Sequence, residues 1–323
     1  MTILKTHRLG KSEIHATMLG LGGGHLDGHE QTDEEAVTLI RGAIERGINF
    51  VDTSAGYGRS EERYGMALSD GWRDKVHLQT KVGSHPKVLR NWSRKATTWS
   101  LENSFRRLRT EYVDSVLIHG PRFDIEEPLD HCLDVMLEWK EKGRIGAVGV
   151  GVRQPEFHMK AIDKGVDIIL SFLNYTLLDQ TLAKESIPYA IQHDVGILIG
   201  SPIADGLLAG HEPKHAISNY QQNTTTEGIL DQNGRVIPAA VGSFRDPNAY
   251  PKAHQMWKWC QDRNVNIRHL AMQFAINAPV QGKGIVLTGA ANLAQLEDSL
   301  HIATSPIDEN IWSEFESTFG IRA

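Results

Sequence analysis

The chain has 323 residues, of which 40% are hydrophobic and 23% charged, and its formal net charge is -6 at pH 7. This composition predicts a globular protein with a large core, and the acidic balance argues against nucleic-acid binding, which needs a basic face. Only two cysteines occur, Cys132 and Cys260, so no disulfide framework is expected. Because neither a signal-length run nor a stretch of about 18 apolar residues is found, we expect a cytoplasmic protein without a membrane segment.

Short apolar runs alternate with amphipathic stretches along the chain. Residues 6–14 predict a small β-hairpin with Gly10 in its turn. The clearest helix covers residues 33–47, with an acidic start, apolar positions at helical spacing and Gly47 as a stop. The predicted strands cover residues 18–22, 48–52, 76–81, 113–119, 146–151, 167–172, 196–200 and 284–287.

Eight strands that are each followed by a helix or a long loop predict an α/β fold, a (β/α)8 barrel. No linker-like stretch separates two halves, so residues 1–323 are expected to form a single domain. One loop is unusually long, since residues 211–250 after the seventh strand are polar and weakly periodic. Loops of this length in compact domains are usually functional or disordered.

Four polar side chains fall at or just after consecutive strand ends. Asp52, Lys81 and His119 end the second, third and fourth strands, and Tyr57 follows the second. In a barrel of this type the chemistry lies at the carboxyl ends of the strands, so these groups are expected to converge. An ammonium group favours a neighbouring phenolate, a carboxylate keeps the ammonium charged, and a histidine can orient a carbonyl oxygen. Hydride transfer to a carbonyl needs such a set.

Each of these residues alone also has an ordinary interpretation. Asp52 could cap a helix, Tyr57 could be a turn aromatic, and His119 could stabilise a loop. Lys81 could be solvated, or it could form a Schiff base as in aldolases. Their joint placement on consecutive strand ends favours the functional interpretation.

The sequence resembles the aldo-keto reductases in six segments that follow in the family's order, from about residue 4 to 318. These segments are GLGGG at 20–24, FVDTSAGYG at 50–58, QTKVG at 79–83, LIHGP at 117–121, SPIADGLLAG at 201–210 and GAANLAQLEDSL at 289–300. The resemblance implies that Asp52, Tyr57, Lys81 and His119 are the catalytic residues, with Tyr57 as general acid and base. It also implies the same barrel fold, with a nicotinamide dinucleotide lying across the barrel mouth.

The resemblance further implies a cofactor site. Its residues would be Gly22, Gly23, Asp52, Ser201, Ile203, Gly206, Gly289, Ala290, Gln295, Asp298 and Ser299. Members that prefer NADP commonly present a lysine and an arginine where this chain has Gly289 and Gln295. The lack of these two cations favours NAD over NADP, and so does the acidic side chain of Asp298, one helical turn after Gln295. A basic residue of the long loop could instead close over the 2′-phosphate of NADP; the loop contains Lys214, Arg235 and Arg245.

The chain departs from the family pattern where many members hold the nicotinamide ring. Gly151 and Val152 stand in place of a Ser-Asn pair, Phe172 in place of a glutamine, and Gly200 in place of a stacking aromatic. The carboxamide contacts must therefore be made differently. Candidates for these contacts are Arg153, Asn174 and backbone groups.

Within the family, LSFLNYTLLDQ at 170–180 and SPIADGLL look most like aldose dehydrogenases, enzymes similar to L-fucose, D-threo-aldose and L-galactose dehydrogenases. A sugar or sugar-like carbonyl is thus the expected substrate, and no metal is expected because no H-x-x-H or HExxH pattern occurs. Arg122 could bind an anionic group, although each substrate candidate taken singly could be a surface loop residue. The substrate candidates are His25, Tyr57, Trp92, His119 and Arg122.

Three other functions stay open at this point. The chain could be an NADPH-dependent reductase of a modified sugar or small aldehyde. It could be a non-catalytic cofactor-binding sensor, because the fold also serves in potassium-channel β subunits. It could be an aldolase that acts through Lys81, although pairing with Asp52 argues against the neutral lysine that such a reaction needs. The sequence makes no prediction of the oligomeric state.

Overall fold

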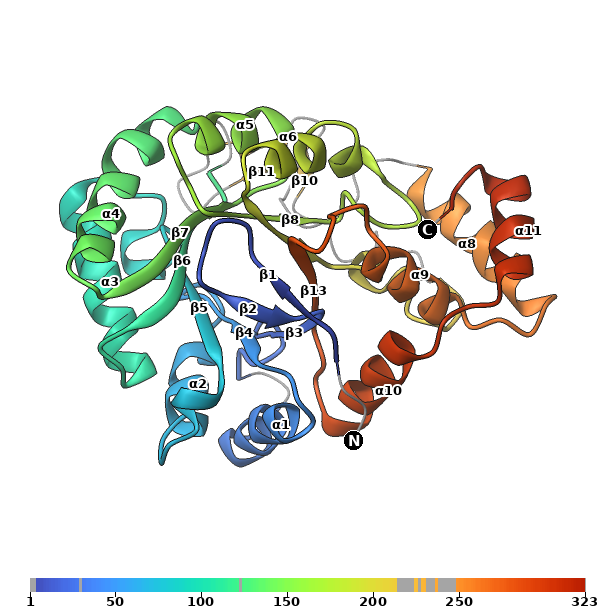
Figure 1. The fold of residues 1–323 in the computed structure, drawn as a ribbon, viewed down its shortest axis with the longest axis horizontal. Helices are drawn as coiled ribbons and strands as arrows, with labels where there is room; N and C mark the ends of the chain where they lie inside the picture. The colour runs from blue at the N-terminus through green and yellow to red at the C-terminus, as the bar shows by residue number, and fades with distance from the viewer. Residues whose placement is uncertain are drawn as a thin grey trace.

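A computed structural model of the protein describes residues 4–28, 31–121, 124–213, 224–225, 228–230, 236–237 and 248–322. Eight parallel strands close into a barrel, in the order β13-β3-β4-β5-β6-β7-β8-β9, with β9 pairing back to β13 (Figure 1). This confirms the predicted (β/α)8 barrel, and every predicted strand agrees within two residues at each end. The barrel strands are β3 Leu19–Gly22, β4 Phe50–Asp52, β5 His77–Val82, β6 Val113–His119, β7 Ile145–Gly151, β8 Ile168–Phe172, β9 Gly196–Gly200 and β13 Gly284–Thr288.

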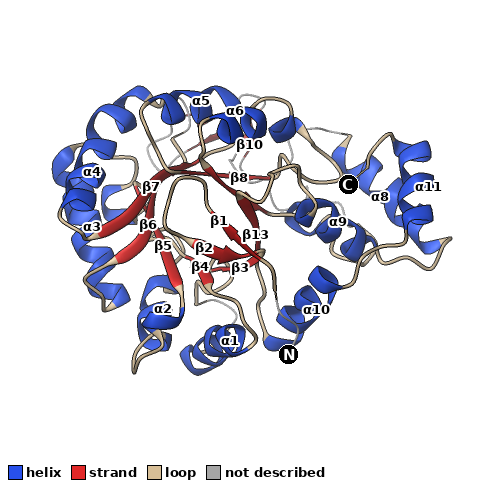
Figure 2. Cartoon of the chain, in the orientation of Figure 1, coloured by secondary structure: helices blue, strands red, loops and turns tan. Residues whose placement is uncertain are grey.

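Helices surround the barrel strands (Figure 2). The first begins with a capping box, in which the Thr32 hydroxyl accepts from the Glu35 N–H and the Glu35 carboxylate accepts from the Thr32 N–H. Outside the ring, α8 and α11 lie side by side, and Trp259 packs edge to face on Phe315. The helices are α1 Asp33–Glu45, α2 Ser60–Ala67, α3 Arg94–Leu108, α4 Leu133–Glu141, α5 Pro155–Asp163, α6 Ser186–Gln192, α8 Ala249–Gln261, α9 Ile267–Ile276, α10 Leu293–Thr304 and α11 Glu309–Phe319.

The predicted N-terminal hairpin is present and covers one end of the barrel. Strands β1 Thr6–Arg8 and β2 His15–Thr17 pair antiparallel. Leu9 packs with apolar side chains of the barrel interior. Gly10 adopts a left-handed φ of 55°, and a Cβ there would lie 2.3 Å from the backbone nitrogen of Gly196. Because Gly196 begins β9, the hairpin closes the amino-terminal end, and the carboxyl ends of the strands form the open mouth.

The segment predicted as a plain long loop contains secondary structure in its described parts. Strands β10 Thr224–Thr225, β11 Gly228–Leu230 and β12 Val236–Ile237 form a small antiparallel sheet. Helix α8 then begins at Ala249, inside the predicted loop. The long segment expected after the seventh strand thus contains short strands and the first residues of α8 in its described parts.

Close packing between α2 and α3 depends on Gly65. A Cβ at this position would lie 2.2 Å from the carbonyl oxygen of Arg107, which is main chain and cannot move aside cheaply. We expect Gly65→Ala to lower the free energy of unfolding by about 1–3 kcal/mol, as overpacking does. Urea denaturation measures this. Gly24→Ala is the matched control, because a Cβ there meets nothing within 4 Å. Equal stability of the two variants would contradict the expectation.

Candidate active site

The predicted site residues follow six strands that are neighbours in the barrel. Strands β9, β13, β3, β4, β5 and β6 are adjacent in that order. Apart from Asp52, which belongs to both sets, the candidates for cofactor binding end or follow β9, β13 and β3, whereas the four candidates for catalysis lie at or after the ends of β4, β5 and β6. Parallel strands bring their carboxyl ends to one edge, so the two sets form one continuous arc of the mouth.

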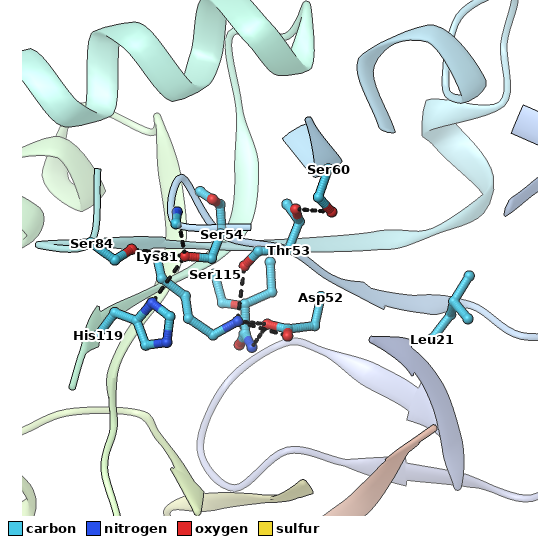
Figure 3. Close-up of polar contacts among 12 residues, drawn as sticks. Leu21, Asp52, Thr53, Ser54, Ser60, Lys81, Ser84, Ser115 and His119 are labelled. Atoms are coloured by element: carbon cyan, nitrogen blue, oxygen red, sulfur yellow. Dashed lines mark hydrogen bonds and ion pairs between the residues drawn. The ribbon is translucent and has the colours of Figure 1, made fainter. Parts of the chain in front are cut away.

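A buried ion pair lies at the centre of this arc (Figure 3). The Lys81 Nζ donates to both carboxylate oxygens of Asp52, at 2.6 and 2.7 Å, and to the carbonyl oxygen of Thr53 at 2.9 Å. Lys81 is fully buried and Asp52 is 4% exposed. Burial lowers the pKa of Lys81, whereas the Asp52 carboxylate and Tyr57 raise it. The two raising effects are together larger than the effect of burial, so the pKa of Lys81 lies above its ordinary value. A lysine kept charged in this way is a poor Schiff-base nucleophile, which disfavours the aldolase alternative.

Tyr57 and His119 lie beside this ion pair. The Lys81 Nζ is 4.7 Å from the centroid of the Tyr57 ring, and the rings of Tyr57 and His119 meet edge to face with centroids 5.5 Å apart. Burial raises the pKa of Tyr57, although Lys81 opposes the rise, so the phenol is protonated at pH 7. Burial and the Lys81 charge lower the pKa of His119 to about 3, so its imidazole is neutral. The mouth thus holds a phenol proton donor and a neutral imidazole side by side.

Two serines that the sequence analysis missed complete this cluster. The Ser54 Oγ lies 2.9 Å from the His119 Nδ1 and 2.8 Å from the Ser84 Oγ. Figure 3 shows dashed lines that join Ser54 to both of the other side chains. Ser54 lies two residues after Asp52, and Ser84 lies three residues after Lys81. Their closeness to these strand ends was the feature of the sequence that could have indicated them as site residues.

The first cofactor candidates, Gly22 and Gly23, lie at the carboxyl end of β3. Gly22 is paired with Asp52 in the β3–β4 register, and the Gly23 N–H donates to the Asp52 carbonyl oxygen at 2.6 Å. That N–H is therefore used within the barrel. After β9, Ser201 has a left-handed φ of 53°, and the loop continues through Ile203 and Gly206. A Cβ on Gly206 would meet nothing within 4 Å, so there is open space beside it, although its N–H donates to the Ile203 carbonyl oxygen at 3.2 Å.

The loop after β13 leads into α10 as expected. Asn292 caps the helix by accepting from the Gln295 N–H at 3.0 Å, and the Gln295 side chain accepts from the Ala291 N–H at 2.9 Å. This places Gly289 and Ala290 directly before a helix start. His25, a substrate candidate, also lies here, since a Cβ on Gly289 would be 2.8 Å from its ring.

Two predicted cofactor residues on α10 are engaged elsewhere, because α9 supplies a partner that the sequence analysis did not consider. Arg268 forms an ion pair with Asp298 and donates to the Ser299 Oγ at 2.7 Å. Ser299 is fully buried and also donates to the carbonyl oxygen of Gln295. The hydroxyl of Ser299 is thus engaged within the fold. The negative charge of Asp298 is compensated by Arg268, which weakens the expected repulsion of a 2′-phosphate.

Trp92 lies after β5, immediately before α3, and is 7% exposed. Its ring covers Gly83, since a Cβ there would fall 2.0 Å from a ring carbon. Trp92 therefore packs against the chain close to Lys81. The remaining candidates, Arg122, Lys214, Arg235 and Arg245, lie outside the described residues.

The end of β7, where the chain departs from the family pattern, is held by a buried histidine. The His158 Nε2 donates to the carbonyl oxygen of Val152 at 3.1 Å, and its Nδ1 lies 2.9 Å from the Ser186 Oγ. Nearby, Asn174 accepts from Ser171 at 2.6 Å and donates to the Arg153 carbonyl oxygen at 3.0 Å. The hydrogen bonds of His158 and Asn174 thus stabilise the backbone just after β7.

His158 is expected to make the fold sensitive to acid. Burial lowers its pKa from 6.5 to about 4, so the folded state favours the neutral ring. This stabilisation is present above pH 6.5 and is lost as the pH falls toward 4, with about 2 kcal/mol lost between pH 7 and 5. Urea denaturation at both pH values should show a smaller fall for His158→Gln than for the wild type. Equal falls in the two proteins would contradict this assignment.

Within the described ranges, no helix combines the length and apolar character that a membrane crossing needs. In the same part of the chain, no three His, Cys, Asp or Glu side chains gather in a group that could hold a metal ion.

Comparison with known proteins agrees with this geometry. Residues 18–318 match the profile of the aldo/keto reductase family. Aldo-keto reductase YhdN of Bacillus subtilis is 28% identical over 88% of this chain and 84% of its own, and the D-threo-aldose 1-dehydrogenase of a Pseudomonas species is 25% identical over 88% and 87%. The solved holo form of aldo-keto reductase AKR11C1 from Bacillus halodurans shares the fold, with a TM-score of 0.74 at 22% identity over 99% and 97% of the two chains. The chain belongs to the aldo/keto reductase family and is an NAD(P)-dependent oxidoreductase.

Proposed function

We propose that this protein transfers a hydride between a nicotinamide cofactor and the carbonyl or hemiacetal carbon of a sugar or sugar-like substrate, with Tyr57 as general acid and base. The observation that carries the proposal is the buried Lys81–Asp52 pair behind Tyr57 and His119. A sugar is favoured because a curated relative is named for an aldose. We also propose that the chain works as a single domain in the cytoplasm.

The described residues fit a dinucleotide along the arc of the mouth. Gly206 leaves open space after β9, and the start of α10 presents backbone N–H groups and a favourable dipole after β13. Gly289, Ala290 and Gln295 would lie along the adenosine end, and Ser201 and Ile203 along the phosphates. The bound cofactor supplies or accepts the hydride.

The chain's own residues would move the proton. In reduction, the Tyr57 O–H gives its proton to the substrate oxygen as the carbon gains the hydride; in oxidation, the phenolate takes that proton back. The Lys81 ammonium stabilises the phenolate, and Asp52 keeps the lysine charged and in place. The neutral His119 ring can orient the substrate oxygen.

NAD is the favoured cofactor. Gly289 and Gln295 offer no positive charge, and the Arg268 guanidinium is already paired with Asp298. A 2′-phosphate would therefore find no uncommitted cation among these side chains. The alternative is an NADPH-dependent carbonyl reductase.

Fluorescence titration of the purified protein with NADH and NADPH tests the cofactor, and a panel of aldoses with NAD tests the reaction. We expect tighter NADH binding and the formation of NADH and a lactone with at least one aldose. Tighter NADPH binding would favour the reductase. Binding without turnover of any aldose or aldehyde would favour a cofactor sensor, and binding of neither cofactor would overturn the proposal.

A further inference from the structure

Helix α9 places an arginine where the two loops proposed to hold the cofactor approach each other. Arg268 lies in the first turn of α9, which packs beside α10 (Figure 1). The loop after β9 also reaches this arginine, since a Cβ on Gly210 would lie 3.8 Å from the Arg268 Cβ. A cation in the first turn opposes the helix dipole, so α9 itself gains no stability from this charge.

The buried hydroxyl of Ser299 fixes the position of the guanidinium. The Ser299 Oγ accepts from the Arg268 Nη2 at 2.7 Å and from the Thr288 Oγ1 at 3.1 Å. It also donates to the Gln295 carbonyl oxygen at 2.8 Å. A hydroxyl has one proton and two lone pairs, so Ser299 has no hydrogen-bonding capacity left for a ligand. Because Thr288 directly precedes Gly289, the guanidinium is held two hydrogen bonds away from the loop that would receive the adenosine end.

Asp298 neutralises the charge of Arg268. The two side chains form an ion pair, in which the Asp298 side chain is 49% exposed and that of Arg268 is 14% exposed. The carboxylate is thus the outer member of the pair. An arginine side chain does not lose its proton in proteins, so only a counter-charge can neutralise it. A 2′-phosphate, with a charge of about −1.5 to −2 at pH 7, would have to displace this carboxylate before it could bind the arginine.

We propose that Arg268 is the cation able to bind the 2′-phosphate of NADP, and that Asp298 occupies it, so that this ion pair makes the protein select NAD. The inference rests on the proposed function, because it adds a specificity-determining pair to the same cofactor site. The ribose of NAD needs no cation, and the exposed carboxylate of Asp298 can accept a hydrogen bond from its 2′-hydroxyl. With NADP, the same carboxylate repels the phosphate and withholds the arginine.

Asp298→Asn tests the pair, because it removes the charge and keeps the shape of the side chain. The Ser299 hydroxyl still holds Arg268, whose guanidinium can then form charge-assisted hydrogen bonds with a phosphate. The matched control is Glu297→Gln. Glu297 is the preceding residue of α10 and is about as exposed, but its carboxylate pairs with Arg46 on α1 at 2.5 Å. Both variants remove one negative charge from the same turn, and only the first frees Arg268.

Calorimetry with two nucleotides that differ only in the 2′-phosphate measures the effect without turnover. The probes are adenosine 5′-phosphate and adenosine 2′,5′-bisphosphate. In Asp298→Asn, the affinity for the bisphosphate relative to the monophosphate should rise about 10- to 100-fold over the wild type, as a new hydrogen bond to a charged group provides. Fluorescence titration should show the same rise for NADPH relative to NADH. Glu297→Gln should keep both ratios close to those of the wild type.

The double variant Asp298→Asn/Arg268→Gln decides whether Arg268 is the cation. It should lose the gain, because the new amide can still donate to Ser299 but carries no charge. A gain that persists there, no gain in Asp298→Asn, an equal gain in Glu297→Gln, or tighter binding of NADPH than of NADH by the wild type would overturn the proposal. If the double variant does not fold, Ser299→Ala in the Asp298→Asn background removes the hydroxyl that holds the guanidinium, and an undiminished gain there would be equally adverse.

The proposed function and the role of the ion pair can fail separately. If Asp298→Asn gains affinity for the 2′-phosphate but no aldose or aldehyde is turned over with either cofactor, the ion pair keeps its role and the proposed hydride transfer is wrong. If aldoses are oxidised with NAD and Asp298→Asn gains nothing, the hydride transfer stands and the role of Arg268 is wrong. If none of the nucleotides binds to any of these proteins, both proposals are wrong.

Discussion

Tyr57→Phe is expected to lower kcat about 10²- to 10⁴-fold and to leave the affinity for the cofactor nearly unchanged. The change removes one oxygen and keeps the ring that packs edge to face on His119, so the geometry of the mouth is retained. The raised pKa of Tyr57 makes the phenol the proton donor at neutral pH. A phenyl ring has no proton to give, and the charged Lys81 behind it cannot replace the phenol without a large cost. Steady-state kinetics and NADH titration of the variant measure both quantities.

Tyr64→Phe is the matched control, because Tyr64 is a nearby tyrosine with a structural role. It is fully buried on α2, and its hydroxyl donates to the Leu21 carbonyl oxygen at 3.2 Å. Loss of this bond should lower the free energy of unfolding by about 1 kcal/mol and leave kcat unchanged. If Tyr57→Phe kept activity at the level of Tyr64→Phe, Tyr57 would not be the acid and base.

The strands and the strand-end residues could be predicted because one physical rule links them. Buried parallel strands are nearly continuous apolar runs, and a polar residue that ends such a run must face the mouth. Asp52, Lys81 and His119 all followed from this rule, and Tyr57 followed from its place in the loop after the second strand. The resemblance to a family then implied the catalytic role of all four. The hairpin followed in the same way from short strands around Gly10.

Pairings between elements that are far apart in sequence could not be predicted. Arg268 meets Asp298 only because α9 packs beside α10, and nothing in the periodicity of either helix indicates the partner. The link from Ser54 to Ser84 spans 30 residues and depends on how two loops meet. His25 was a polar substrate candidate near the mouth, yet the position of its ring beside Gly289 depends on the path of a loop.

Asp52→Asn should destabilise the protein by about 3–5 kcal/mol, because it leaves the buried Lys81 ammonium without its counter-charge. The amide keeps an oxygen that can accept from Gln79, which donates to the Asp52 Oδ1 at 2.7 Å, so the loss comes mainly from charge. The change also removes an influence that raises the pKa of Lys81, so the phenolate of Tyr57 loses its support and activity falls. Urea denaturation and kcat are the measurements.

The double variant Asp52→Asn/Lys81→Met separates the two roles of the pair. Lys81→Met alone should also cost about 3–5 kcal/mol, because it leaves the Asp52 carboxylate buried without the ammonium. With both charges removed, neither desolvation penalty remains, so the double variant should be more stable than either single variant. Its kcat should nevertheless stay as low as theirs, since no cation is left beside Tyr57. Additive losses of stability would show that the pair holds the fold by other contacts, and recovered activity would remove Lys81 from the mechanism.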